Sequence, residues 1–346
     1  MQTGCLIAFH FESQTLWIMA GSQTSLMANH FVKLWVVAVI IMVCLPGQSH
    51  SAEALQEVKI GYTSTSTSVF PIEFARRKGF LREEGLNTVM IVMRTNIIIN
   101  ALITRGIEYG TPATSVIRAA ASDLPVKTVA VLTGRPDYFL AAKREFKSLK
   151  DLKGRRIAIG TFGAAADIAL RVVLRQEGLD PERDVIRLQM GGGDARFAAL
   201  ASGTVDATIL NFPFNLQAEK LGFTVLLWLG ERVEMPLSGL GVRDETIQKT
   251  PGQVLGLIRA VHRAVTFAKA NPEETVQAFM DWARVDRELA TKSYELGTKS
   301  WPDNLIISDT AIKAVVDQAQ AELKIRGPIP LDKVRDWSFA EKVTRK

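Results

Sequence analysis

The pattern of hydrophobic positions repeats once along the chain. A short apolar run at 58–62 leads through a loop of hydroxyl residues into a segment of helical periodicity that closes with Glu-Gly-Leu at 84–86. A second apolar run, at 156–160, is followed in the same order by a small-residue loop and a helical segment that closes with Glu-Gly-Leu at 177–179. Short β-branched runs predict buried strands, and a glycine after a helical segment is typical of a helix end with left-handed backbone. The pattern therefore predicts two strand–loop–helix units of one design.

The correspondence continues beyond these two units. Further strand-like runs follow at 89–93 and 185–190, and matching Ala-Leu segments that contain a glycine and an acidic residue follow at 101–109 and 199–207. The offset between matching positions stays between 93 and 98 residues. Strand–helix–strand alternation predicts parallel strands with helices on both faces of a sheet. The predicted fold class is therefore α/β, with two doubly wound lobes.

We expect the chain to cross between the two lobes twice. The first lobe is assigned 57–145 and the second lobe 146–235. The remainder, 236–346, is mainly helical in its periodicity and is expected to return to the first lobe. Two crossings would form a hinge with a cleft between the lobes.

The N-terminal extension, 1–52, has the features of a secretory signal peptide. Its apolar run at 34–45 follows Lys33 and is shorter than the roughly 20 residues that span a bilayer. Small residues at 51–52 offer a cleavage site, and Met27 is a candidate start. The prediction is a periplasmic protein, with an uncleaved N-terminal anchor as the alternative.

The composition of the expected mature chain argues against several kinds of catalytic, metal and nucleic-acid site. Both cysteines and three of the four histidines lie in 1–52, which leaves His262 alone, in a helical pattern. A Ser-His-Asp triad, a Cys-His pair and a histidine-rich zinc site are therefore disfavoured. The net charge of +6 is spread along the chain without a basic tract, which argues against nucleic acid as a partner. No Walker A sequence occurs, and Gly191 to Gly193 lack the spacing of a dinucleotide site, so we expect no cofactor, no metal and no catalysis.

Ligands of open α/β sheets bind beyond the carboxyl ends of the strands. The candidate ligand site is therefore formed by four loops, at 63–68, 114–115, 161–164 and 211–213. Hydroxyl side chains offer donors and acceptors, and small side chains let a ligand approach the backbone. Helix capping is the alternative for each Ser or Thr, and a core position is the alternative for each Phe. Glu108 and Asp206 precede two of the loops at matching places, so we interpret them as structural hydrogen-bond partners of a helix or the hinge, with a catalytic carboxylate pair as the alternative. The predicted ligand-binding residues are Thr63, Ser64, Thr65, Ser66, Ser68, Thr114, Ser115, Thr161, Phe162, Gly163, Ala164, Asn211, Phe212 and Pro213.

Four arginines, Arg94, Arg118, Arg135 and Arg196, fall in or near loops at the predicted cleft. Each is a candidate partner for a ligand carboxylate or sulfonate, because a guanidinium binds such groups with two hydrogen bonds. A solvated surface role is the alternative for each of them. The sequence does not distinguish one from another.

Three segments, at 60–86, 147–161 and 198–214, resemble the periplasmic substrate-binding proteins of ABC importers, in the nitrate/sulfonate/taurine and thiamine-pyrimidine-precursor group. The resemblance extends from about residue 57 to residue 340. It implies the type II periplasmic binding fold and delivery of a solute to a membrane permease that a separate ATPase subunit drives. It also implies ligand contacts at the same four loops.

The first loop departs from the pattern of that group. Members that bind thiamine precursors often present aromatic residues there, whereas this chain has only Ser and Thr at 63–68. The expected ligand is therefore no more specific than a small polar or anionic organic solute, bound by a monomer. Two alternatives remain open. One is an enzyme of the same fold that makes the thiamine pyrimidine from a histidine of its own chain, and the other is a module that presents ligand to a membrane sensor.

Overall fold

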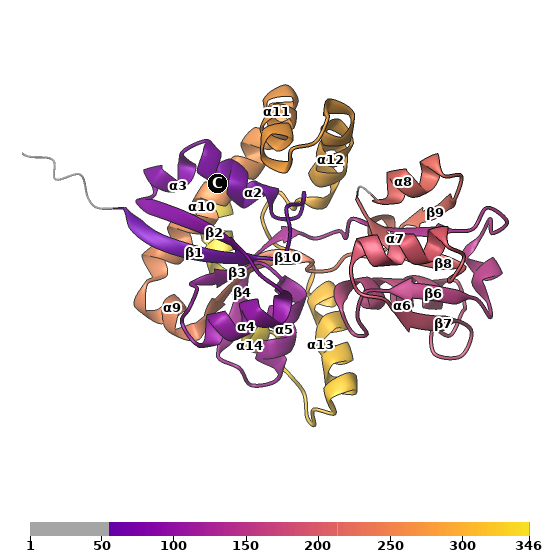
Figure 1. Cartoon of the computed structure of the whole chain (residues 1–346). Coiled ribbons are helices and arrows are strands. Elements are labelled where there is room, and N and C mark those ends of the chain that lie inside the picture. The colour runs from indigo at the N-terminus through magenta and orange to yellow at the C-terminus, as the bar shows by residue number, and fades with distance from the viewer. Residues whose placement is uncertain (1–54, 213, 346) are drawn as a thin grey trace, which may run out of the picture. The chain divides into compact units, whose positions relative to one another are not determined.

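The chain forms two five-stranded sheets, each covered by helices on both faces (Figure 1). The computed structural model describes residues 55–212 and 214–345. The predicted signal peptide, within 1–52, lies outside the described residues. The predicted α/β fold with two doubly wound lobes is confirmed.

The two sheets share one strand order. The first is ordered β2-β1-β3-β10-β4 and the second β7-β6-β8-β5-β9. In each sheet the first three strands are parallel, and the fourth, β10 or β5, is antiparallel to both of its neighbours. The first sheet contains β1 (Gln56–Tyr62), β2 (Leu86–Val92), β3 (Tyr109–Gly110), β4 (Val126–Thr133) and β10 (Ser238–Arg243). The second contains β5 (Tyr138–Ala142), β6 (Arg156–Ile159), β7 (Ile186–Gln189), β8 (Ala207–Asn211) and β9 (Thr224–Trp228).

The chain changes sheet twice, before each of these antiparallel strands. It passes from β4 to β5 across 134–137 and from β9 to β10 across 229–237, which includes the short 3₁₀ helix η2 (Leu229–Glu231). β5 therefore pairs in the second sheet, although it lies within 57–145, the range predicted for the first lobe. Its apolar sequence favours a strand in either sheet, and only the partner strands β8 and β9 decide which one it joins.

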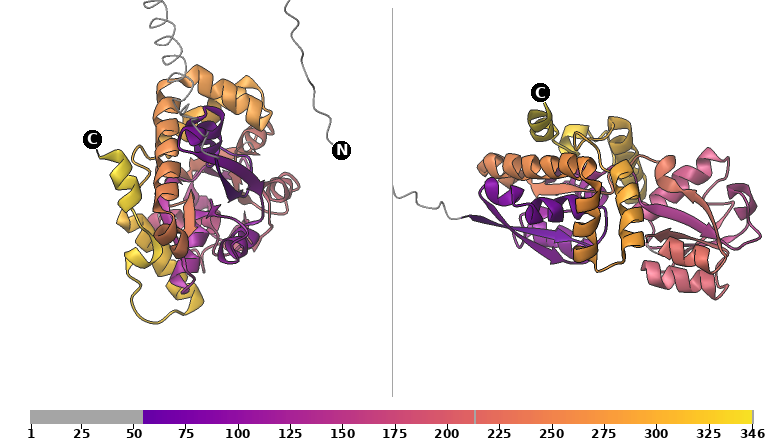
Figure 2. Two further views of the ribbon diagram at one scale, coloured as in Figure 1. Left: turned by 90° about the vertical axis from the view of Figure 1, so that its left-hand side faces the viewer. Right: turned by 90° about the horizontal axis from the view of Figure 1, so that it is seen from above.

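Helices of the first lobe bury a large apolar core. One face of the sheet packs against α2, α3 and α10, and the other face packs against α4, α5 and α13. α10 lies along the sheet (Figure 2) and buries an apolar stripe that includes Val254, Ile258 and Val261. These helices are α2 (Phe70–Arg77), α3 (Phe80–Glu83), α4 (Thr95–Ile103), α5 (Ala113–Ala121), α10 (Pro251–Ala270) and α13 (Asp309–Leu323). The other helices of the first lobe are α9 (Asp244–Lys249), α11 (Pro272–Ala283), α12 (Arg287–Ser300), α14 (Leu331–Val334) and α15 (Ser338–Thr344).

The second lobe repeats this arrangement with fewer helices. α6 (Ala165–Gln176) and the 3₁₀ helix η1 (Leu149–Leu152) cover one face of its sheet, and α7 (Gly193–Ala201) and α8 (Phe214–Lys220) cover the other. Gly85 and Gly178 have φ values of +75° and +79°, so the two helix ends predicted from Glu-Gly-Leu are confirmed.

The repeated acidic residues make matching hydrogen bonds. A carboxylate oxygen of Glu108 accepts a bond from the backbone N–H of Lys59 at 2.7 Å, and one of Asp206 accepts a bond from the backbone N–H of Arg156 at 3.0 Å. Each bond ties the segment before one strand to the neighbouring strand of the same sheet. Both residues therefore have a structural role, but the partners are strands of the sheets, and the expected helix or hinge partners are wrong.

Two further results apply to residues 55–212 and 214–345. No helix in these ranges has both the length and the hydropathy needed to cross a membrane. No group of three or more His, Cys, Asp or Glu side chains there is arranged to hold a metal ion.

Candidate functional site

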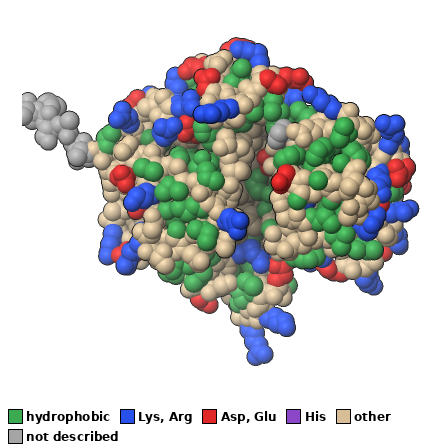
Figure 3. Space-filling model, in the orientation of Figure 1, with side chains coloured by type: hydrophobic (Ala, Val, Ile, Leu, Met, Phe, Trp, Pro, Cys, Tyr) green, Lys and Arg blue, Asp and Glu red, His purple; other side chains and the backbone are tan. Residues whose placement is uncertain are grey.

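A cavity of about 820 Å³ is lined by residues of both lobes. Figure 3 shows the hollow between the two halves of the surface. The lining includes the segments that follow the carboxyl ends of β1, β3 and β6, together with the last residue of β8. Parallel strands thus bring their carboxyl ends to one place, as the sheet topology requires.

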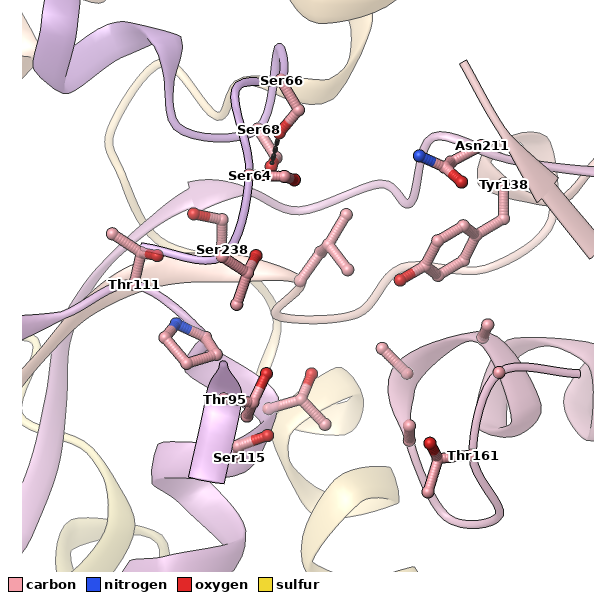
Figure 4. A pocket seen from close by; sticks show the side chains of 18 of the residues that line it. Ser64, Ser66, Ser68, Thr95, Thr111, Ser115, Tyr138, Thr161, Asn211 and Ser238 are labelled. Atoms are coloured by element: carbon pink, nitrogen blue, oxygen red, sulfur yellow. Dashed lines mark hydrogen bonds between the residues drawn. The ribbon is translucent and has the colours of Figure 1, made fainter. Parts of the chain in front are cut away.

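The loop after β1 presents serine hydroxyls to the cavity from the first lobe. Ser66 Oγ and Ser68 Oγ are 2.8 Å apart and share a hydrogen bond (Figure 4). The backbone of the loop is fixed from behind, because Trp301 Nε1 donates to the Thr67 carbonyl at 3.0 Å and Thr133 Oγ1 donates to the Ser68 carbonyl at 3.1 Å. The loop is therefore held in place by its own lobe before any ligand arrives.

Other hydroxyls extend the first-lobe wall beyond this loop. Thr114 Oγ1 donates to the Pro236 carbonyl at 2.6 Å, which joins α5 to the second crossing. Ser238 Oγ is buried and has no hydrogen-bond partner among the described residues. Thr95 and Thr111 also line the cavity. Apart from Arg118 of α5, the polar groups of this wall are neutral.

The second-lobe wall lies opposite. Tyr138 and Asn211 point into the cavity from β5 and β8, and Thr161 lies on the loop after β6 (Figure 4). Asn211 Nδ2 makes only a long contact of 3.5 Å with the Phe212 carbonyl. Phe162 is 53% exposed at the rim, with the Arg187 guanidinium carbon 5.4 Å from its ring centroid.

Most of the predicted ligand-binding residues line this cavity. Thr65 is exposed and Phe212 half-buried, and both lie outside the lining, while Pro213 lies outside the described residues. The predicted residues in the lining are Thr63, Ser64, Ser66, Ser68, Thr114, Ser115, Thr161, Phe162, Gly163, Ala164 and Asn211. The polar lining residues that sequence reasoning missed are Thr95, Asn96, Asn100, Thr111, Asp137, Tyr138 and Ser238.

The four candidate arginines differ in their exposure and in their partners. Arg94 is exposed before α4, and Arg135 donates from Nη1 to the Gly230 carbonyl at 2.9 Å, which links the two crossings. Arg118 and Arg196 line the cavity. Arg118 is 2.8 Å from a carboxylate oxygen of Glu322, so its charge is balanced within the protein.

Arg196 is buried without a counter-charge. Its side chain, on α7, is 6% exposed and makes no hydrogen bond or ion pair with another described residue, and Nε is among the buried nitrogens without a partner. A Cβ added at Gly160 would lie 3.1 Å from Arg196 Nη1, so the glycine at the end of β6 makes room for the guanidinium. Burial lowers the pKa of Arg196, and the exposed Asp194 acts in the opposite direction without forming an ion pair. An arginine stays charged even so.

Asp137 is the second buried charge in the cavity. It lies in the first crossing, is 7% exposed and has no side-chain partner among the described residues. Burial raises its pKa to about 6. Burial also raises the pKa of the neighbouring Tyr138, which Asp137 raises further and Arg196 lowers. The phenol is therefore within electrostatic reach of both charges.

Glu322 of α13 contacts both lobes beside the cavity. Besides Arg118 of α5, it accepts a bond from Arg171 Nη1 of α6 at 3.2 Å. Gly163 has a φ of +71°, and a Cβ there would lie only 2.5 Å from Glu322 Oε2. Burial acts to raise the pKa of Glu322, but bonds from Gln318 and the arginines lower it overall.

Comparison with known proteins identifies the family. A sequence model described as NMT1/THI5 like matches residues 66–275. The riboflavin-binding protein RibY of Chloroflexus aurantiacus is 30% identical over 231 residues, which cover 64% of this chain and 64% of RibY, so the chain matches less than two thirds of that relative. The 4-amino-5-hydroxymethyl-2-methylpyrimidine phosphate synthase THI12 of Saccharomyces cerevisiae is 24% identical over 251 residues, or 65% of this chain and 71% of the synthase.

A solved structure has the same fold. The periplasmic aliphatic sulphonate binding protein SsuA of Escherichia coli superposes with a TM-score of 0.67 at 18% identity, covering 80% of this chain and 91% of SsuA. This likeness confirms the fold of periplasmic binding proteins. The resemblance inferred from the sequence is confirmed, and the chain belongs to the NMT1/THI5-like family.

Proposed function

We propose that this protein is an extracytoplasmic solute-binding protein that captures a small polar organic solute between its lobes and delivers it to the permease of an ABC importer. The observation that carries the proposal is the polar cavity lined from both lobes. Its volume of about 820 Å³ falls within the range that organic ligands occupy in proteins. Free polar groups such as Ser238 Oγ and the Asn211 amide supply the hydrogen bonds that orient a ligand.

The names of related proteins support this function. RibY and several further relatives are called binding proteins, and SsuA is called periplasmic. We propose the same compartment here, with export by the signal peptide predicted within 1–52, a permease with a separate ATPase as partner, and a monomeric state. Sequencing the N-terminus of protein recovered from the periplasm tests the export proposal, and size-exclusion chromatography with light scattering tests the monomer.

The decisive experiment is a thermal-shift screen. The protein is first unfolded and refolded to remove any solute carried from the cell, and then tested against sulfonates, carboxylates, nitrate, nucleobases, pyrimidines and riboflavin. A solute at 100 times its Kd stabilises the native state by about 2.7 kcal/mol, which gives a clear shift of Tm. The absence of a shift with every class would contradict solute binding.

An enzyme of thiamine-pyrimidine synthesis is the second candidate, because the yeast synthase is a relative. That chemistry would consume a histidine of the chain itself. The candidate histidine, His262, is half-buried on α10 and is not among the residues that line the cavity. We expect His262→Gln to leave solute binding unchanged, and a loss of binding in that variant would favour the enzyme.

A further inference from the structure

Two charged groups of opposite sign line the cavity without a side-chain partner among the described residues. The Arg196 guanidinium and the Asp137 carboxylate are each more than nine-tenths buried, and neither makes an ion pair with a described residue. Burying an unpaired charge is costly, because the protein interior does not replace the lost hydration. An unpaired buried charge is therefore expected where a group of a bound ligand will compensate it.

The other buried charged side chains of the described ranges show what ordinary compensation looks like. Glu73 is 1% exposed and accepts bonds from Arg76 and Arg77 at 2.6 to 2.8 Å. Asp167 is fully buried and accepts bonds from Arg187 at 2.5 Å and from the backbone N–H of Gly163 at 2.9 Å. Arg196 and Asp137 are the two exceptions in these ranges, and both line the same cavity.

The first-lobe position that corresponds to Arg196 holds an apolar residue. α4 and α7 are matching helices of nine residues, and their fourth residues are Ile98 and Arg196. Ile98 is fully buried in the first-lobe core against Gly61 at the end of β1, as Arg196 lies against Gly160 at the end of β6. A position that holds an aliphatic side chain in one lobe thus holds a guanidinium in the other.

We propose that the solute is dipolar, with an oxyanion that Arg196 binds and a positively charged nitrogen that Asp137 binds. This inference rests on the proposed function and names its ligand class. A simple anion would satisfy Arg196 but would bring a second negative charge toward Asp137. A solute with both groups satisfies both buried charges, with Tyr138 and the first-lobe hydroxyls left for its neutral parts.

The test uses matched pairs of probes. ω-Aminocarboxylates and ω-aminosulfonates of increasing chain length are each compared with the same molecule lacking the amine, by calorimetry on refolded protein. The variants are Arg196→Gln and Asp137→Asn, with Arg94→Gln as the control, because Arg94 is exposed and lies outside the lining. Any solute found in the thermal-shift screen is titrated against the same variants.

We expect the wild-type protein to prefer the amine-bearing member of a pair at least tenfold. Arg196→Gln should weaken binding of both members about 100-fold. Asp137→Asn should weaken only the amine-bearing member and so remove or reverse the preference. Arg94→Gln should change nothing, and neither cavity variant should lower the Tm of the ligand-free protein.

Two results would overturn the inference. One is tight binding of a solute without a nitrogen donor that Asp137→Asn leaves unchanged. The other is a lower ligand-free Tm in both cavity variants, which would mean that the two groups stabilise the fold as a structural pair. In either case solute binding itself would stand. The proposed function fails separately, if no compound in the screen or in the probe series binds the wild-type protein.

Discussion

The two walls of the cavity share a topology and differ in their chemistry. Apart from Arg118, whose charge Glu322 balances, the polar groups of the first-lobe wall are neutral, and its loop is fixed by Trp301 and Thr133. The second-lobe side carries Arg196, and the crossing that leads into its sheet carries Asp137. A duplicated framework therefore preserves the strand order, while single side chains at equivalent positions decide which lobe forms core and which presents charge.

The largest effect is expected when Ile98 is replaced by the residue type of the equivalent position, Arg196. Ile98→Arg places a charge in the first-lobe core, and we expect the free energy of unfolding to fall by at least about 4 kcal/mol. Urea denaturation measures the loss, with Ile98→Val as the control, which should cost about 0.5–1.5 kcal/mol. A fully stable Ile98→Arg protein would mean that the two positions are not equivalent in burial.

The pH dependence of stability isolates Asp137. Its pKa is raised to about 6 in the folded protein from 3.8, so folding favours the protonated acid. The stabilising effect is complete below about pH 4 and is lost as the pH rises through about 6. We expect Asp137→Asn to match the wild type near pH 4 and to exceed it near pH 7 by an amount of the order of 3 kcal/mol.

Urea denaturation of both proteins between pH 4 and pH 8 measures this difference. Burial lowers the pKa of His262, but this group is common to both proteins and cancels in the comparison. A difference that does not vary with pH would show that Asp137 is not desolvated in the ligand-free protein.

The reverse exchange, Arg196→Ile, should give the second lobe the core chemistry of the first. We expect solute affinity to fall about 100-fold, because the group proposed to bind the oxyanion is gone. Ligand-free stability should stay equal or rise, since replacing buried ionic groups with apolar ones is often stabilising. Calorimetry and thermal melting measure the two effects, and a loss of stability with intact binding would contradict the assignment.

Asn211→Ala probes a neutral group of the second-lobe wall. Its amide makes only a weak internal contact, so we expect about tenfold weaker solute binding, as for the loss of one hydrogen bond, with little change in stability. The exposed Asn87→Ala serves as control. Equal losses in binding and in folding would assign Asn211 a structural role.

The smallest effect is expected at Glu322, which contacts both lobes. Glu322→Gln removes partly exposed ion pairs with Arg118 and Arg171, each worth less than about 1 kcal/mol, so the global free energy of unfolding should fall only slightly. The radius of gyration of the ligand-free protein, measured by X-ray scattering, should increase slightly and lose its dependence on salt. Asp317→Asn, on the same helix, is the control. An equal change in its radius of gyration would contradict a specific role of Glu322 between the lobes.

The sequence predicted the fold well because its signals are local. Strand periodicity and the helix ends at Gly85 and Gly178 depend on neighbouring residues, and their repetition along the chain indicated two lobes. The sheet that β5 joins depends on distant partner strands, which no local pattern encodes.

The site was predicted only in part for the same reason. Loops after parallel strands are recognisable, and most of their predicted residues line the cavity. Asp137 lies in a crossing and Ser238 at the start of a strand, where no motif marks a site. Arg196 was one of four equivalent arginines, and only its burial beside Gly160 separates it from the others.

The two crossings are bonded to each other as well as to the lobes. Arg135 Nη1 donates to the Gly230 carbonyl, and Trp228 Nε1 donates to the Pro136 carbonyl at 2.8 Å. Strands linked in this way resist independent twisting, so we expect the lobes to rotate about a single axis. A pair of fluorescent dyes, one on each lobe, would then follow solute capture through one distance, which suits the protein to use as a reagentless optical sensor.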